Sequence, residues 1–193
     1  MRLVLASLSP RRAELLRRLG VPFEVIPSEI EEAWPPGTPR EGVTALALAK
    51  ARSVALHVGT AVVLGADTGV VLDGRVLGKP DSPEGARRML RELRGRQHEV
   101  ITGVAVVEAP TGRETATAVV TRVLMREYRE AEIEAYVATG EPFDKAGAYA
   151  IQGAGGALVA KVEGCYTNVV GLPLTTTRRL LEECGVISRR GAS

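Results

Sequence analysis

The continuous apolar run from Ala61 to Ala66 places a strong constraint on the fold. A run without alternation between polar and apolar residues suits a central strand that is covered on both faces. Asp67 and Thr68 follow the run directly, so we expect them at the carboxyl end of this strand. That end is where open α/β sheets bind their ligands.

The segment after the run has the pattern of a β-hairpin. Asp73-Gly74, a strong short hairpin signal, separates the segments Val70–Leu72 and Arg75–Leu77. The return strand ends at Gly78-Lys79-Pro80. The sequence therefore predicts Asp67 and Lys79 at the same end of one hairpin.

Strands and helices alternate along much of the remaining chain. Apolar runs predict strands at Leu3–Ala6, Phe23–Ile26, Val100–Val107 and Thr115–Met125. Serine or threonine caps followed by proline, and glycines at the far ends, predict helices at about 10–19, 38–56, 83–94, 130–138 and from about 173. With no repeat and no linker, the pattern predicts an α/β fold with a mixed central sheet flanked by helices, forming one domain over residues 1–193.

Composition excludes several classes of partner. The 25 basic and 23 acidic residues nearly cancel, and aromatic residues make up only 4% of the chain, so nothing predicts binding to nucleic acid or to a membrane surface. No apolar stretch approaches the length of a membrane span or of a signal sequence. Cys165 and Cys184 form no CxxC pair and read as thiols of a cytosolic protein. We expect a cytoplasmic protein whose anion sites are local.

The first candidate anion site lies between the first predicted strand and helix. Ser7, Ser9, Arg11 and Arg12 combine free amides, a helix dipole and guanidinium groups, all of which favour phosphate oxygens. The alternative is that Ser9 is an ordinary helix cap and the arginines form a solvated first turn. The Walker A pattern is absent from the sequence.

Asp67 is the main candidate for chemistry. A carboxylate next to a buried strand suits a general base or a metal ligand, although an aspartate before threonine also commonly caps a turn. Glu31 and Glu32, in an acidic loop, are further oxygen donors for a magnesium-type ion unless they are merely solvated.

Two other residue types stand out. Arginine has replaced lysine almost everywhere, and only Lys50, Lys79, Lys145 and Lys161 remain. In the glycine-rich segment, Gln152 has an amide that offers both a donor and an acceptor to a nucleobase edge, or else to backbone groups of its own turn. His98 has no evident partner and is interpreted as a surface residue.

Four separated blocks, in order along nearly the whole chain, closely resemble the Maf family: Leu5–Arg12, Gly65–Thr68, Gly78–Pro80 and Gly140–Gly153. The resemblance implies an elongated mixed sheet in two lobes with a cleft between them, similar to the inosine triphosphate pyrophosphatase fold. It also implies a homodimer and a divalent metal cation, Mg or Mn, for cleavage between the α and β phosphates of a nucleoside triphosphate.

The resemblance also implies roles for individual residues. Asp67 matches the proton acceptor of the family, with Ser7, Arg12, Lys50 and Lys79 at the phosphates and with Glu32 and Asp67 at the metal. Arg11, Thr68 and Gln152 match the subgroup that hydrolyses dTTP and UTP, an activity suited to cleaning the nucleotide pool.

Two alternatives and one departure accompany this expectation. The subgroup acting on 7-methyl-GTP carries a bulky aromatic residue at the position of Arg11, which makes that substrate the second choice. A nucleotide-binding regulator of cell division without catalysis is the other alternative. Gly69 departs from the family pattern, which has a β-branched residue there, so the turn that holds Asp67 is expected to be looser.

Overall fold

The computed structural model describes residues 1–31, 33–109 and 111–188. The chain forms two compact units. Unit 1 comprises Met1–Asp67, Thr102–Val119 and Gly171–Ser193, and unit 2 comprises Thr68–Ile101 and Val120–Val170. The single domain and the cleft between two lobes expected from the sequence stay predictions.

A mixed sheet of seven strands forms the centre of the fold, which confirms the predicted α/β class. The strand order is β2-β1-β3-β5-β6-β7, with β4 also paired to β3. β1 is parallel to both β2 and β3, whereas the β3–β4 and β6–β7 pairs are antiparallel. The strands are β1 (Leu3–Leu5), β2 (Glu24–Val25), β3 (Ala61–Leu72), β4 (Arg75–Leu77), β5 (Gln97–Ala109), β6 (Arg113–Met125) and β7 (Val159–Glu163).

The helices begin where the sequence predicts local caps. Ser9, Thr38 and Ser82 accept hydrogen bonds from the first turns of their helices, each of which has proline in its first turn. The α-helices are α1 (Pro10–Arg17), α2 (Pro39–Ala55), α3 (Pro83–Leu93), α4 (Glu130–Ala138), α5 (Tyr166–Val170) and α6 (Leu174–Glu183). The 3-10 helices are η1 (Glu141–Asp144), η2 (Ala146–Ala148) and η3 (Ala154–Leu158). Among the described residues, no helix has the length and apolar character needed to cross a membrane.

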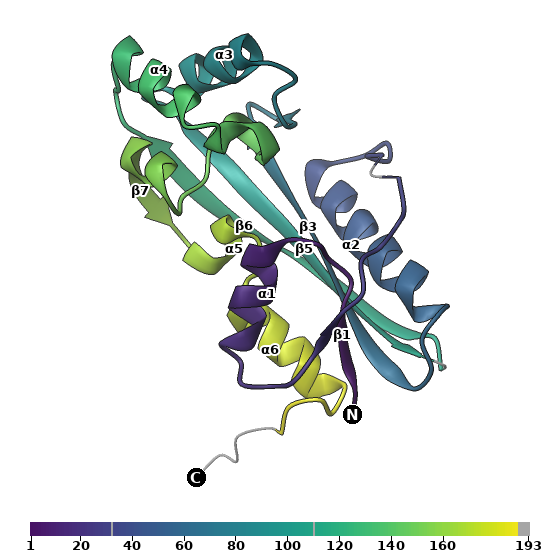
Figure 1. Cartoon of the computed structure of the whole chain (residues 1–193). Helices are drawn as coiled ribbons and strands as arrows, with labels where there is room; N and C mark the ends of the chain where they lie inside the picture. Colours follow the sequence, from purple (N-terminus) through teal and green to yellow (C-terminus); the bar gives the residue numbers. More distant parts are fainter. Residues whose placement is uncertain (32, 110, 189–193) are drawn as a thin grey trace. The chain divides into compact units, whose positions relative to one another are not determined.

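In unit 1, α2 packs closely on one face of the sheet (Figure 1). A Cβ at Gly65 would lie 2.1 Å from the Ala47 carbonyl oxygen, and one at Gly103 would lie 2.2 Å from the Val43 carbonyl oxygen. Both glycines are therefore needed for the backbone of α2 to approach β3 and β5. α1 and α6 lie on the other side of β1 from α2 (Figure 1).

In unit 2, one apolar core joins the hairpin β3–β4 to α3, α4 and the segment that contains Tyr149. The hairpin turns at Asp73-Gly74, where both residues have positive φ (51° and 77°), as the sequence predicts. Asn168 of α5 is fully buried and donates hydrogen bonds to Val100 O and Thr121 Oγ1, both at 2.9 Å.

Two expectations about local structure are wrong. Asp67 does not end its strand, because β3 continues to Leu72 and pairs with β4 beyond it. The pairing with β1 does end at Leu64, so Asp67 lies just past the parallel part of the sheet. His98 is buried, with only 2% of its surface exposed.

Candidate functional site

The turn between β1 and α1 ties Arg12 to Ser7. Ser7 Oγ accepts hydrogen bonds from Ser9 N (3.2 Å) and from Arg12 Nη1 (3.3 Å). Arg12 Nε donates to the Gly171 carbonyl oxygen at 2.9 Å, which fixes the guanidinium plane from a segment far away in the sequence. The turn therefore holds a hydroxyl and a guanidinium group together at a helix N-terminus, an arrangement suited to phosphate oxygens. Ser9 caps α1, as the ordinary interpretation had it.

Arg11 differs from Arg12 in its partners. Its side chain is half-buried, and its buried Nε has no hydrogen-bond partner among the described residues. A buried donor without an acceptor costs free energy. Arg11 thus has a donor that the described part of the protein does not use.

The strongest electrostatic feature of unit 1 is an ion pair between Lys50 of α2 and Asp67 of β3. Lys50 Nζ lies 2.7 Å from Asp67 Oδ1, and the two side chains are only 8% and 9% exposed. The close approach of α2 at Gly65 explains this contact, since Ala47 touches Gly65 and Lys50 lies about one helical turn further along.

Burying such a pair is costly. The loss of hydration of two ions commonly offsets most of their attraction, so a buried ion pair is weak evidence for stability. Charged groups kept in a water-poor environment are instead typical of functional sites. The ammonium also stabilises the ionised carboxylate, which is the form of Asp67 that accepts a proton or binds a cation.

The predicted site residues of unit 2 are Thr68, Lys79 and Gln152. Thr68 directly follows Asp67 within β3 and is partly exposed. Lys79 is exposed, two residues after β4, and forms no ion pair with any described residue. Gln152 is half-buried, and its amide forms no hydrogen bond within residues 1–31, 33–109 and 111–188.

The loop around Gln152 is held by a carboxylate that the sequence interpretation did not single out. Glu141 accepts hydrogen bonds from Ala154 N and Gly155 N, each at 3.1 Å. One possible role for Gln152 was to form hydrogen bonds with backbone groups of its own turn. Glu141 forms such hydrogen bonds instead. Its position directly after Gly140, inside a segment that resembles the Maf family, was the available signal.

A second missed contact joins His98 to Tyr149. His98 Nε2 lies 2.7 Å from Tyr149 Oη, and the rings meet edge to face with centroids 5.4 Å apart. Burial lowers the pKa of His98 to about 4 and raises the pKa of Tyr149. His98 is therefore neutral near pH 7 and serves the core of unit 2. The alternation of buried residues at His98 and Val100 in one strand was the signal for its burial.

Metal ligands remain a prediction. Glu32 lies outside the described residues. Within the described ranges, no three side chains of histidine, cysteine, aspartate or glutamate come together as a metal-binding group. Ser7 lies against Arg12, and Lys50 against Asp67, whereas the expected meeting of these residues with Lys79 and Gln152 stays a prediction.

Comparison with known proteins gives consistent relatives. A dTTP/UTP pyrophosphatase of Moorella thermoacetica is 60% identical over 96% of both chains. Proteins of the same name from Anaeromyxobacter dehalogenans and Dictyoglomus thermophilum are 54% and 49% identical, covering 95% of this chain and 94% and 96% of theirs. Among solved structures, a nucleoside-triphosphatase (dITP/XTP pyrophosphatase) of Mycobacterium abscessus covers 98% of this chain and 100% of its own, with a TM-score of 0.49 and 18% identity. The family model for Maf-like proteins matches residues 2–184, and the chain therefore belongs to the Maf family.

Proposed function

We propose that this protein hydrolyses dTTP and UTP to the nucleoside monophosphate and pyrophosphate, and thereby removes unwanted nucleotides from the pool. The observation that carries the proposal is the buried Lys50–Asp67 ion pair, next to the parallel part of the sheet. Its support from the comparisons is that relatives up to 60% identical are named dTTP/UTP pyrophosphatases.

In the proposed reaction, Asp67 acts as the general base. Its carboxylate accepts a proton from a water molecule whose oxygen attacks the α-phosphorus. A new P–O bond forms to the water oxygen, the bond from the α-phosphorus to the α–β bridging oxygen breaks, and pyrophosphate leaves. Lys50, at 2.7 Å, orients the carboxylate before the water binds.

Ser7, Arg12, Lys50 and Lys79 are proposed to bind the phosphates. The hydroxyl of Ser7 and the guanidinium of Arg12 lie within 3.3 Å of each other, so they can contact neighbouring oxygens of one phosphate chain. The exposed ammonium of Lys79 can reach a phosphate without first leaving a partner among the described residues. Preorganised donors of this kind stabilise charge that develops on phosphate oxygens during the reaction.

A divalent cation, Mg or Mn, is proposed as the cofactor. The donor chemistry fits, because the buried carboxylate of Asp67 is a hard oxygen ligand and such ions commonly complete their shell with water and substrate phosphates. Asp67 and Glu32 would hold it. When bound, the cation would neutralise charge on the phosphates and on the leaving pyrophosphate.

Arg11, Thr68 and Gln152 are proposed to select the base. The amide of Gln152 offers one donor and one acceptor, matching the adjacent carbonyl and N–H groups of uracil and thymine. Because this amide has no partner among the described residues, binding a pyrimidine breaks no internal hydrogen bond. Arg11 and Thr68 would then shape the remainder of the base site.

A panel of nucleotides tests the proposal. Pyrophosphate release is measured with dTTP, UTP, GTP and 7-methyl-GTP, each with Mg or Mn, and with Asp67→Asn as the inactive control. We expect the highest kcat/KM for dTTP and UTP. A preference for 7-methyl-GTP would assign the protein to the other subgroup, and tight binding without hydrolysis would indicate a regulator.

A homodimer is also proposed, on the basis of the family resemblance alone, and a cytoplasmic location is proposed on the basis of the cysteine pattern of the sequence. Sedimentation equilibrium across a range of protein concentrations would test the dimer. A monomer mass at all concentrations would contradict it.

A further inference from the structure

The loop from Ala150 to Gly156, here called the Gln152 loop, is fastened to the preceding segment by Glu141. Glu141 Oε2 accepts a hydrogen bond from Ala154 N, and Oε1 accepts one from Gly155 N, each at 3.1 Å. One carboxylate thus fixes the two consecutive amides on the C-terminal side of Gln152. Both oxygens are used, so the carboxylate itself is held in one orientation.

Tyr136 of α4 completes the fastening on the other side of Gln152. Its hydroxyl donates to Glu141 Oε1 at 3.0 Å and accepts from Ala150 N at 3.2 Å. The Tyr136 hydroxyl therefore connects Ala150 N, at the start of the loop, to the Glu141 carboxylate, which binds the end of the loop. Together, Tyr136 and Glu141 form a clamp with anchor points before and after Gln152.

Two glycines of the loop lie so close to the clamp that a larger residue would collide with it. Gly153 has φ of 78°, and a Cβ there would lie 2.7 Å from Glu141 Oε2. A Cβ at Gly155 would lie 2.6 Å from the Tyr136 hydroxyl and 2.5 Å from the Ala150 carbonyl oxygen. The irregular spacing of these glycines, which fits no dinucleotide motif, follows from close packing against the two side chains.

We infer that Glu141 and Tyr136 are positioning residues for base recognition, because their clamp presents the Gln152 amide to the pyrimidine edge before nucleotide binds. The inference rests on the proposed role of Gln152 as the residue that reads the base. Gln152 makes none of the clamp's hydrogen bonds, so its amide is available while its backbone is fixed.

The physical consequence concerns binding rather than the chemical step. A loop that is already ordered loses less conformational entropy when the base binds, and a misaligned amide cannot discriminate between bases. The proposed proton transfer depends on Asp67 rather than on the clamp. Loss of the clamp should therefore raise KM and reduce discrimination while kcat changes little.

Two conservative variants test the inference. Tyr136→Phe removes the hydroxyl alone, and Glu141→Gln replaces one acceptor oxygen with an NH₂ group that faces a backbone N–H. We expect KM for dTTP and UTP to rise about tenfold and kcat to change by less than about twofold, with a smaller ratio of kcat/KM between dTTP and GTP. Hydrogen–deuterium exchange of residues 150–156, measured without nucleotide, should become faster in both variants.

Glu163→Gln is the matched control. Glu163 lies on β7 in the same unit and pairs with Lys161 at 2.7 Å on the surface. This change should leave KM, the dTTP-to-GTP ratio and exchange in residues 150–156 as in the unmodified protein. Similar effects from Glu163→Gln would attribute the result to charge removal in general and would overturn the inference.

Gln152→Ala separates failure of the inference from failure of the proposed function. If Gln152→Ala leaves the dTTP-to-GTP ratio of kcat/KM unchanged, Gln152 does not recognise the base. Both the proposed role of Gln152 and the inference about the clamp are then wrong. If Gln152→Ala lowers the ratio but Glu141→Gln and Tyr136→Phe do not, only the inference about the clamp is wrong. If the inference holds, Glu141→Gln added to Gln152→Ala lowers the ratio no further, since both changes act through one amide.

Discussion

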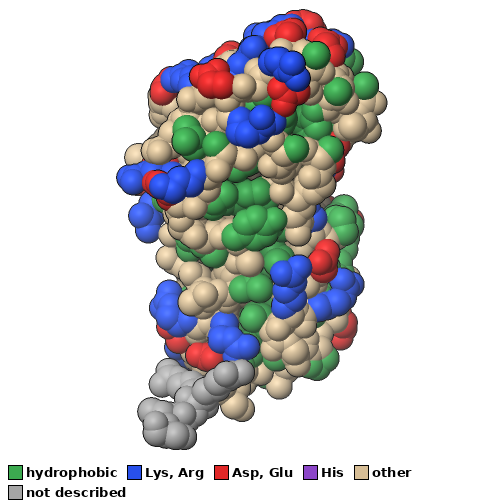
Figure 2. Space-filling view, turned by 90° about the vertical axis from the view of Figure 1, so that its left-hand side faces the viewer, with side chains coloured by type: hydrophobic (Ala, Val, Ile, Leu, Met, Phe, Trp, Pro, Cys, Tyr) green, Lys and Arg blue, Asp and Glu red, His purple; other side chains and the backbone are tan. Residues whose placement is uncertain are grey.

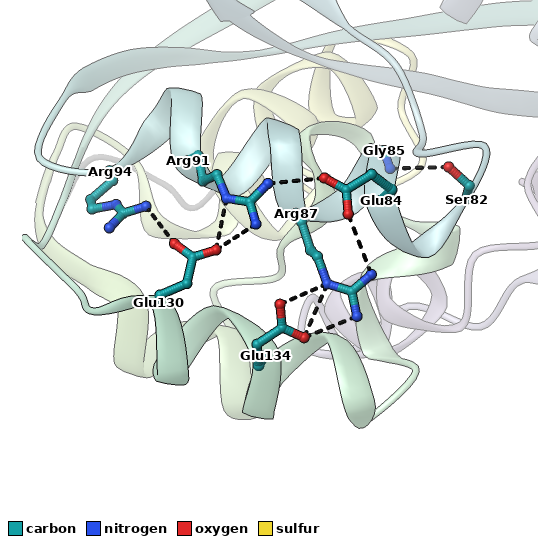
Figure 3. Close-up of polar contacts among 8 residues, drawn as sticks. All are labelled: Ser82, Glu84, Gly85, Arg87, Arg91, Arg94, Glu130 and Glu134. Atoms are coloured by element: carbon teal, nitrogen blue, oxygen red, sulfur yellow. Dashed lines mark hydrogen bonds and ion pairs between the residues drawn. The ribbon is translucent and has the colours of Figure 1, made fainter.

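Charged side chains are used in two contrasting ways in the two units. Among the described residues of unit 1, Lys50 and Asp67 form an ion pair between side chains that are almost fully buried. Unit 2 carries an exposed network of arginines and glutamates between α3 and α4, where acidic and basic side chains lie intermingled on the surface (Figures 2 and 3). Burial, rather than the number of ion pairs, distinguishes the candidate site from the surface.

The network on α3 and α4 is extensive. Arg87 contacts Glu134 through three hydrogen bonds of 2.8–3.0 Å, and Arg91 donates to both Glu84 and Glu130 (Figure 3). The hydrogen bond from Arg91 lowers the pKa of Glu130 below its ordinary value. Each acidic member is about half exposed or more, so solvent and salt weaken every pair.

The buried pair has the opposite balance. Little water can reach either side chain of Lys50–Asp67, so the loss of one removes the opposite charge that lies 2.7 Å from the other in a water-poor environment. Stability favours distributing charges over the surface, as α3 and α4 do. A pair such as Lys50–Asp67 is better explained by the chemistry that it supports.

The largest expected effect comes from the buried carboxylate itself. Asp67→Asn keeps the shape of the side chain but removes the base, so pyrophosphate release should fall by about 10²–10⁴-fold. Nucleotide binding, measured by calorimetry, should persist because the Ser7–Arg12 turn is unchanged. Activity close to that of the unmodified protein would exclude Asp67 as the base. The buried pair would then differ from the exposed network on α3 and α4 in burial but not in function.

Removing the partner of Asp67 should produce the largest loss of stability. Lys50→Met retains most of the side-chain volume but removes the ammonium that lies 2.7 Å from the buried Asp67 carboxylate, at a cost of about 3–5 kcal/mol in the free energy of unfolding. Urea denaturation measures this loss. Adding Asp67→Asn to Lys50→Met should recover part of it, because no charge is then buried.

Lys161→Met is the control for this prediction. Lys161 is also paired with a glutamate, but its side chain is 63% exposed. The denaturation midpoint should therefore stay close to that of the unmodified protein. Equal losses of unfolding free energy in Lys50→Met and Lys161→Met would show that burial of an ion pair does not determine the cost of breaking it.

Much of this architecture could be predicted because its causes are local. The caps at Ser9, Thr38 and Ser82, and the turn at Asp73-Gly74, depend on residues within one turn of chain. The apolar run that begins at Ala61 correctly predicted a buried strand. Its end was misplaced because Thr68-Gly69 reads locally as a turn, whereas pairing with β4 keeps the chain extended to Leu72.

The rest depends on contacts between distant residues. Lys50 and Asp67 were each singled out, but their contact requires α2 to pack on Gly65 and Gly103. His98 was misread as a surface residue because its partner, Tyr149, lies 51 positions away. Glu141 was overlooked because its hydrogen bonds reach 13 and 14 residues along the chain, to amides that carry no sequence signature.

His98 tests whether a charge is as costly to bury in unit 2 as in the Lys50–Asp67 pair of unit 1. Its pKa is lowered to about 4 by burial, whereas an unfolded chain binds the proton below its ordinary value of 6.5. Protons therefore favour the unfolded state in this window, and stability is lost as pH falls from 6.5 to about 4. The expected loss from this residue is about 3 kcal/mol.

Urea denaturation at pH 7, 5.5 and 4.5 measures this effect as a difference between proteins. His98→Phe keeps an aromatic ring against Tyr149 and should flatten the pH dependence within this window. His57→Phe, at the other histidine of the chain, changes an exposed residue and should leave the dependence as it is. Unchanged pH dependence in His98→Phe would show that burial does not lower the pKa of His98 in the folded protein.

The smallest effect is expected where the ion pairs are most numerous. Glu130→Gln removes the shared partner of Arg91 and Arg94, yet all three side chains are between 27% and 48% exposed. The melting temperature should fall by no more than about 2 °C in low salt, because exposed pairs contribute little and the arginine stems still pack on the helices. In about 1 M NaCl, the difference from the unmodified protein should shrink further, since the screening length drops to about 3 Å. A large decrease in melting temperature that does not depend on salt would mean that the network acts as one preorganised unit. Burial would then not be what distinguishes the Lys50–Asp67 pair from this network.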